Sequence, residues 1–266
     1  MLQPMRIPYY HVDAFTTQSF GGNPAGVCVL ERWLPEAVLQ SIAAENNLSE
    51  TAFFMREADC YNLRWFTPST EVDLCGHATL AAAFVLFSEL GYAEPQIRFQ
   101  TQSGELMAER SGEIIELNFP ARPPVPCPFP DQLLRGLGRE PREVLKARDY
   151  LAVFDSPADV AALRPDMEAL MKLDSLGVIV TARGDTADFV SRFFAPRVGV
   201  PEDPVTGSAH CSLIPFWAER LGKSKLFARQ ISRRGGELHC RHLGKRVSIG
   251  GGALIYCRGE IDTPAC

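Results

Sequence analysis

The feature that most constrains the fold of this chain is an internal duplication. Three short patterns occur twice in the same order, and their two copies are separated by 128, 131 and 132 residues. Solenoid repeats have periods of about 20–50 residues, so a period near half of the 266-residue chain indicates two copies of one domain. The patterns are RWFTP (64–68) with RFFAP (192–196), GHA (76–78) with GSA (207–209), and GEL (104–106) with GEL (236–238).

A proline-rich segment separates the two copies. Residues 120–130 contain six prolines in eleven residues, and proline has a fixed φ and no backbone N–H. We therefore expect a stiff, extended linker over 120–130, with one half before it (1–119) and one after it (131–266). A C-terminal segment is expected to cross back to the first half. The alternative is a long loop within a single domain.

Each half is predicted to combine strands with helices in one shared order. An amphipathic helix comes early, apolar and aromatic strands follow, and a second helix ends at Gly91 or Gly222 before a hairpin. The helix over 77–90 is apolar on nearly every face, so it has to be enclosed. We expect an α+β fold of two pseudo-symmetric halves, each a mixed, curled, barrel-like β-sheet around a central helix.

The composition argues against several functional classes. The formal net charge is −5 and no long basic run occurs, which disfavours nucleic-acid binding. The most apolar stretch, residues 78–87, is shorter than the roughly 20 residues that span a bilayer. The chain has eight cysteines but no C-x-x-C pair, and it shows neither an export signal nor a phosphate-binding loop. We therefore expect a cytoplasmic protein with reduced thiols and no metal, acting neither on nucleic acid nor at a membrane.

Two helix starts are candidate binding elements. Gly76 and Gly207 open the matching helices, where free N–H groups and the positive end of the helix dipole favour anions. Brought together by the duplication, the two starts would form a cradle for a small carboxylate-bearing molecule. The alternative is that both glycines only permit tight turns.

The two copies differ at the residues that carry chemistry. Cys75 and His77 flank the first glycine, whereas Thr206 and Ser208 flank the second. Glu50 lies at the start of an apolar strand and has no acidic counterpart in the second copy. Desolvation there is expected to raise the pKa of its carboxyl group toward the range useful for proton transfer.

Each of these residues also has a structural interpretation. Glu50 fits a surface carboxylate beside a helix, and His77 fits a core histidine. Asp203, in the loop before the second glycine, fits a helix cap. At the start of a helix, His77 is expected to be a neutral imidazole.

Five motifs together resemble the PhzF-like phenazine-biosynthesis family. They are spread over nearly the whole chain in the family's order: GNPAGV (22–27), NLSETAF (47–53), RWFTP (64–68), LCGHAT (74–79) and EDPVTGSAH (202–210). The resemblance implies a fold like that of diaminopimelate epimerase, with two similar halves. It also implies an isomerase that moves a proton between carbons without a metal or cofactor, and a homodimer.

The resemblance also assigns roles to individual residues. It implies three catalytic residues, Glu50, His77 and Asp203, which are expected to line one cavity. It implies that Gly207 and Ser208 bind the substrate, and Ser49 and Gly76 are expected to bind it as well. The expected reaction is proton transfer by Glu50, as general acid and base, within a small carboxylate-bearing metabolite, cyclic unsaturated compounds included.

Two other functions stay open at this point. Epimerases of this fold use two opposed cysteines, but here Thr206 occupies the place opposite Cys75, and a hydroxyl is a far weaker acid and base than a thiol. Cys75 is therefore expected to be a small buried residue. An epimerase or racemase of an amino-acid-like compound is the second hypothesis. The third is a small-molecule-binding protein on the same fold that does not turn over.

Overall fold

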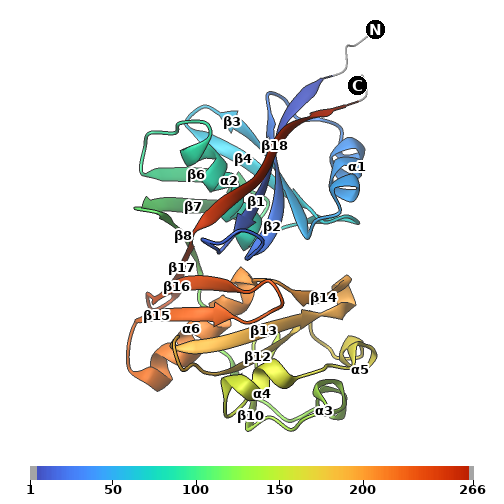
Figure 1. The fold of residues 1–266 in the computed structure, drawn as a ribbon, viewed down its shortest axis with the longest axis vertical. Coiled ribbons are helices and arrows are strands. Elements are labelled where there is room, and N and C mark those ends of the chain that lie inside the picture. Colours follow the sequence, from blue (N-terminus) through green and yellow to red (C-terminus); the bar gives the residue numbers. More distant parts are fainter. Residues whose placement is uncertain (1–4, 264–266) are drawn as a thin grey trace. The chain divides into compact units, whose positions relative to one another are not determined.

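A computed structural model describes residues 5–263, and these form two compact units (Figure 1). The second unit is continuous and comprises residues 119–249. The first unit is discontinuous: residues 5–118 are joined by residues 250–263. The proline-rich segment expected as a linker thus belongs to the second unit, where Val125 and Pro126 pair with Lys146 and Leu145.

The first unit contains one mixed sheet and two helices. In spatial order its strands are β18, β1, β2, β3, β4, β6, β7 and β8; the β2–β3 and β4–β6 pairs are parallel and the other pairs antiparallel. The short β5 pairs with β4. The elements are β1 (Arg6–Ala14), β2 (Asn23–Leu30), α1 (Glu36–Asn46), β3 (Glu50–Glu57), β4 (Cys60–Phe66), β5 (Glu71–Val72), α2 (Gly76–Ser88), β6 (Gln96–Thr101), β7 (Gly104–Ser111), β8 (Ile114–Pro120) and β18 (Ala253–Asp262).

Helix α2 is the core of the first unit. Ten of its thirteen residues are buried, so no side of this helix is exposed to solvent. It packs against β1, β2, β3, β7 and β18, which means that the sheet curls around it. Helix α1 lies against the other side of the sheet, where Leu39 and Ile42 join a cluster with Phe53 and Phe66.

The second unit has the same kind of sheet. Its strand order is β9, β10, β11, β12, β13, β15 and β16, with parallel β11–β12 and β13–β15 pairs. The short β14 pairs with β13. The elements are β9 (Val125–Pro126), α3 (Asp131–Leu137), β10 (Glu143–Lys146), β11 (Tyr150–Val153), α4 (Pro157–Ala162), α5 (Met167–Met171), β12 (Val178–Arg183), β13 (Phe189–Ala195), η1 (Pro196–Val198), β14 (Val200–Asp203), α6 (Gly207–Leu221), β15 (Lys225–Gln230), β16 (Gly236–His242) and β17 (Arg246–Gly251).

The two units share one order of elements. Strands β2, β3, β4 and β6 of the first unit correspond to β11, β12, β13 and β15 of the second, with the same parallel and antiparallel pairings. Helix α6 matches α2, and eleven of its fifteen residues are buried. The predicted α+β fold, a curled mixed sheet around a central helix in each half, is confirmed. Helices α3 and α4 were not predicted.

Across residues 5–263, every helix is too short or too polar to span a bilayer.

Candidate active site

In the first unit, three polar residues converge at one edge of the sheet. Strands β2 and β3 are parallel and in a register that pairs Ala25 with Glu50, so both strands begin at this edge. Asn23 opens β2, and Glu50 opens β3 directly after the half-buried Ser49. Helix α2 begins with Gly76 and His77. The contact between Asn23 and His77 places this helix start at the same edge.

His77 lies at the centre of this group. Its Nε2 atom is 3.2 Å from Oε2 of Glu50, and its Nδ1 atom is 3.2 Å from Nδ2 of Asn23 and 3.5 Å from Sγ of Cys75. The His77 side chain is 6 % exposed and that of Glu50 is 18 % exposed. Burial lowers the pKa of His77 from 6.5 to about 3, so the imidazole is neutral at physiological pH.

The Glu50–His77 contact is close without being a formed hydrogen bond. Within residues 5–263, Nε2 of His77 has no hydrogen-bond partner of acceptable geometry, so the Glu50 oxygen at 3.2 Å lies away from the N–H direction. The edge therefore holds a carboxylate and a neutral imidazole whose buried Nε2 atom has no hydrogen-bond partner among the described residues.

The same residues form a possible metal-binding group. Glu50, Cys75 and His77 each offer a ligand atom, and these atoms lie within 4.8 Å of one another. A thiol, an imidazole and a carboxylate are a donor set that zinc accepts. Coordination of a metal through Nδ1 of His77 would displace the Asn23 contact. Coordination through Nε2 would place the metal next to the Glu50 carboxylate, which could then not act as a base.

In the second unit, Asp203 is held by a compact hydrogen-bond network. The Thr206 hydroxyl donates to Oδ2 of Asp203 at 2.5 Å. Gln230, which is 1 % exposed, accepts from the Thr206 N–H at 2.9 Å and donates to the Asp203 carbonyl at 2.8 Å. These bonds fix the turn between β14 and α6, so the Asp203 carboxylate has a defined position.

Ser208, in the first turn of α6 after Gly207, is linked to a cation. Arg148 donates from Nη2 to the Ser208 hydroxyl at 2.9 Å. The buried Asp149 anchors Arg148 through Nε at 3.1 Å and Nη2 at 2.9 Å, and its other oxygen accepts from the Gly177 N–H. Arg148 precedes β11 and Gly177 precedes β12, so this group lies at the edge that matches Asn23 and Glu50 in the first unit.

His210, one turn into α6, is a second buried imidazole. Nδ1 of His210 donates to the Thr206 carbonyl at 2.8 Å, and Nε2 has no hydrogen-bond partner among residues 5–263. Its ring lies against Phe189, with the centroids 5.8 Å apart. Burial lowers the pKa of His210 from 6.5 to about 4, so this ring is also neutral near pH 7.

The predicted site residues thus form two groups, one in each unit. Glu50, His77 and Gly76 lie together in the first unit, with Ser49 next to Glu50. Asp203, Gly207 and Ser208 lie at the start of α6 in the second. A common cavity for the two groups stays a prediction.

Sequence reasoning missed three residues that contact the predicted ones. Asn23 stands in a motif that was recognised but given no role. Arg148 and Gln230 lie far from Ser208 and Asp203 in the chain, and no local pattern marks them.

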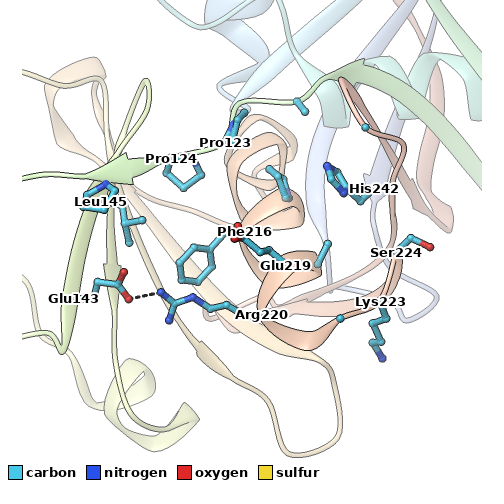
Figure 2. A pocket seen from close by; sticks show the side chains of 16 residues that line it. Pro123, Pro124, Glu143, Leu145, Phe216, Glu219, Arg220, Lys223, Ser224 and His242 are labelled. Atoms are coloured by element: carbon cyan, nitrogen blue, oxygen red, sulfur yellow. Dashed lines mark hydrogen bonds and ion pairs between the residues drawn. The ribbon is translucent and has the colours of Figure 1, made fainter.

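The second unit also contains a cavity of about 1010 Å³ at the other end of α6 (Figure 2). Prolines of the 120–130 segment and Phe216 line it, together with a Glu143–Arg220 ion pair of 2.5 Å. None of the predicted site residues lines this cavity.

Comparison with known proteins decides the family. The PhzC-PhzF family, described as phenazine biosynthesis-like protein, matches residues 12–259. The chain belongs to this family. An "uncharacterized isomerase" of Pseudomonas aeruginosa is 54% identical over 257 residues, which cover 97% of this chain and 99% of the relative. The resemblance predicted from the five motifs is therefore confirmed.

Solved structures agree with this assignment. A PhzF-family protein from Enterococcus faecalis is 50% identical, with a TM-score of 0.95 over 97% of this chain and 100% of that one. A predicted epimerase from Pseudomonas aeruginosa shares the fold, with a TM-score of 0.74 at 20% identity over 97% and 100% of the two chains. The names of the family members confirm the predicted enzyme class, an isomerase.

Proposed function

We propose that this member of the PhzC-PhzF family isomerises a small carboxylate-bearing metabolite by proton transfer, with Glu50 as general acid and base. The observation that carries the proposal is the 3.2 Å contact between Glu50 and a buried, neutral His77. A neutral imidazole carries no positive charge that would pair with the carboxylate and lower its basicity, so Glu50 keeps its capacity to act as a base.

The proposed step is balanced within one molecule. Glu50 removes a proton from a carbon next to an unsaturated or carbonyl group, and the electron pair of the broken C–H bond moves into that group. The protonated Glu50 then returns the proton to a different carbon, where a new C–H bond forms. Substrate and product are isomers, so no electron acceptor is consumed. A neutral imidazole N–H can stabilise the negative charge that develops between the two transfers.

The second unit supports the substrate class. The Ser208 hydroxyl and the Arg148 guanidinium form a donor set of the kind that binds carboxylates. Nη1 of Arg148 makes no hydrogen bond in the described part of the chain, and the side chain is 34 % exposed. In this proposal the group holds the carboxylate of the substrate, and Asp203 orients another polar group.

A second candidate function is epimerisation with Cys75 as one of the two acid–base groups. The observation in its favour is the 3.5 Å contact between Sγ of Cys75 and Nδ1 of His77, since an imidazole can take a proton from a thiol. The observation against it is Thr206, whose hydroxyl already donates to Asp203 at the matching position of α6.

Solvent deuterium incorporation tests the proposal. The protein is incubated in D₂O with a panel of small unsaturated carboxylates and amino acids, and each recovered compound is analysed by mass spectrometry and chiral chromatography. We expect an isomerised carboxylate, with a mass gain of one unit in the molecules for which the Glu50 carboxyl proton exchanges with D₂O before it is returned. Glu50→Gln should lower that rate by roughly 10²–10⁴-fold, because an amide cannot shuttle a proton.

Two further variants separate the candidates. Glu57→Gln, at the exposed far end of the same strand, is the matched control and should keep full activity. Cys75→Ser should have a mild effect. If the protein inverts a stereocentre, and if this activity is lost in Cys75→Ser but kept in Glu50→Gln, the protein is an epimerase and the proposed isomerase mechanism is wrong. Full activity of Glu50→Gln would refute the role of Glu50.

A further inference from the structure

Asn23 is the residue that orients His77. The sequence motifs predicted no role for it. The Asn23 side chain is completely buried, and its amide nitrogen is 3.2 Å from Nδ1 of His77. An amide NH₂ group can only donate a hydrogen bond. Nδ1 of His77 must therefore be the acceptor, and in a neutral ring with Nδ1 as acceptor the proton is on Nε2.

A second, independent contact gives the same tautomer. Oε2 of Glu50 is 3.2 Å from Nε2 of His77, on the opposite side of the ring from Asn23. A proton on Nε2 is attracted by a carboxylate, whereas the lone pair of an unprotonated Nε2 would be repelled by it. The Asn23 amide and the Glu50 carboxylate thus favour the same neutral tautomer, the one with the proton on Nε2.

We propose that Asn23 is a positioning residue that holds His77 in the Nε2–H tautomer, so that His77 is a neutral hydrogen-bond donor next to Glu50. The chemical partner of this donor is the oxygen, or other electronegative atom, on which negative charge develops when Glu50 removes a proton. This last part rests on the proposed function. The assignment of the tautomer does not depend on it.

This donor is buried and is not used by a neighbouring residue among those that the structure describes. Nε2 of His77 forms no hydrogen bond within the described chain, although Glu50 is close to it. The N–H group is therefore held in direction by Asn23 but is not consumed by a neighbour. An imidazole that donates while neutral does not have to be reprotonated between turnovers.

The matching place of the second unit differs in chemistry. There Arg148 precedes the first parallel strand and donates to Ser208, the residue that follows the helix-start glycine as His77 does in α2. A donor from the start of this strand thus contacts the first turn of the central helix in both units. Only in the first unit does the acceptor have two neutral tautomers, so only there can the donor select between them.

Nuclear magnetic resonance of the ligand-free protein tests the tautomer. In protein labelled with ¹⁵N in both histidine and asparagine, long-range ¹H–¹⁵N spectra distinguish Nε2–H from Nδ1–H, and His77→Gln identifies the His77 signals by their loss. We expect Nε2–H in the unmodified protein, together with a scalar coupling across the hydrogen bond from Nδ2 of Asn23 to Nδ1 of His77. An Nδ1–H tautomer would overturn the proposal without any variant.

Asn23→Asp reverses the polarity of the contact. A carboxylate accepts instead of donating, so we expect His77 to change to the Nδ1–H tautomer. Asn46→Asp is the matched control, because Asn46 contacts the hydroxyl of Thr51, which can donate as well as accept, and no change of tautomer should follow. A His77 signal unchanged in a folded Asn23→Asp protein would overturn the proposal. If that variant does not fold, the coupling in the unmodified protein decides.

The two proposals fail separately. With a compound that exchanges deuterium in the panel, we expect Asn23→Asp to lower the rate by roughly 10²–10⁴-fold, as expected for an imidazole in the wrong tautomer. If His77 has the Nε2–H tautomer but no compound shows Glu50-dependent deuterium exchange, the proposed isomerase function is refuted and the positioning role of Asn23 still stands. A shifted tautomer with an unchanged exchange rate would show that the His77 donor does not serve the reaction, which overturns that part of the inference.

Discussion

Replacing His210 with threonine should make the second unit less sensitive to acid. His210 is completely buried, and burial lowers its pKa from 6.5 to about 4. The first unit suggests the replacement, because Thr79 occupies the matching position of α2. The Thr79 hydroxyl donates to the Cys75 carbonyl at 2.5 Å, as His210 donates to that of Thr206.

The sign of the effect follows from proton binding. A histidine with a lowered pKa in the folded state binds fewer protons there than in the unfolded chain, so stability is complete above pH 6.5 and falls as the pH drops toward 4. Between pH 8 and pH 5 this costs about 2 kcal/mol. Threonine removes this loss, but its smaller volume costs about 1 kcal/mol at every pH. We expect His210→Thr to be less stable than the unmodified protein at pH 8 and at least as stable at pH 5.

Urea unfolding at the two pH values measures this difference. Pulsed hydrogen exchange followed by mass spectrometry of peptides from α6 reports on the second unit alone, which excludes the contribution of His77 in the first. His239→Thr, at an exposed position on β16, is the matched control and should keep the pH dependence of the unmodified protein. If His210→Thr lost as much stability between pH 8 and pH 5 as the unmodified protein does, the reasoning would be refuted.

Three other substitutions test the second unit. Gln230→Leu leaves the Thr206 N–H and a carbonyl without partners, so we expect a loss of about 2–4 kcal/mol in urea unfolding; a neutral result would mean that the turn rearranges. Gly136→Ala places a Cβ 2.3 Å from Cδ2 of Leu170, and we expect a lower Tm and a loss of about 1–3 kcal/mol; an unchanged Tm would contradict this. Arg148→Met should raise KM for the exchanging carboxylate by about 10–100-fold with a smaller change in kcat; a loss confined to kcat would argue against carboxylate binding.

The fold was predictable because its main signal is local. The repeated patterns mark the same places in both units: the end of β4 or β13, the start of α2 or α6, and the start of β7 or β16. The apolar character of residues 77–90 was enough to require a sheet curled around that helix. The pairing of Val125 and Pro126 with β10 could not be predicted, because proline is tolerated at the edge of a sheet and no local pattern marks β9 as an edge strand.

The candidate site was predictable only in part. Glu50 and His77 were found because each lies in a short motif with an asymmetric counterpart. Their contact depends on the parallel register of β2 and β3, which no local pattern contains. Gln230 reaches Asp203 across 27 residues, because its strand β15 lies beside β13, the strand that also pairs with β14. Such long-range contacts come from sheet topology and not from spacing along the chain.

The return of β18 to the first unit has a consequence for synthesis on the ribosome. Strand β1 ends at Ala14, and its antiparallel partner starts at Ala253, which is made 239 residues later. At about 5–20 residues per second, the delay is roughly 12–50 s. During that time the nine residues of β1 present an unpaired strand edge, the kind of surface that other nascent chains can join. The second unit is contiguous and can be completed first, so translation speed and chaperones should affect the yield of the first unit more than that of the second.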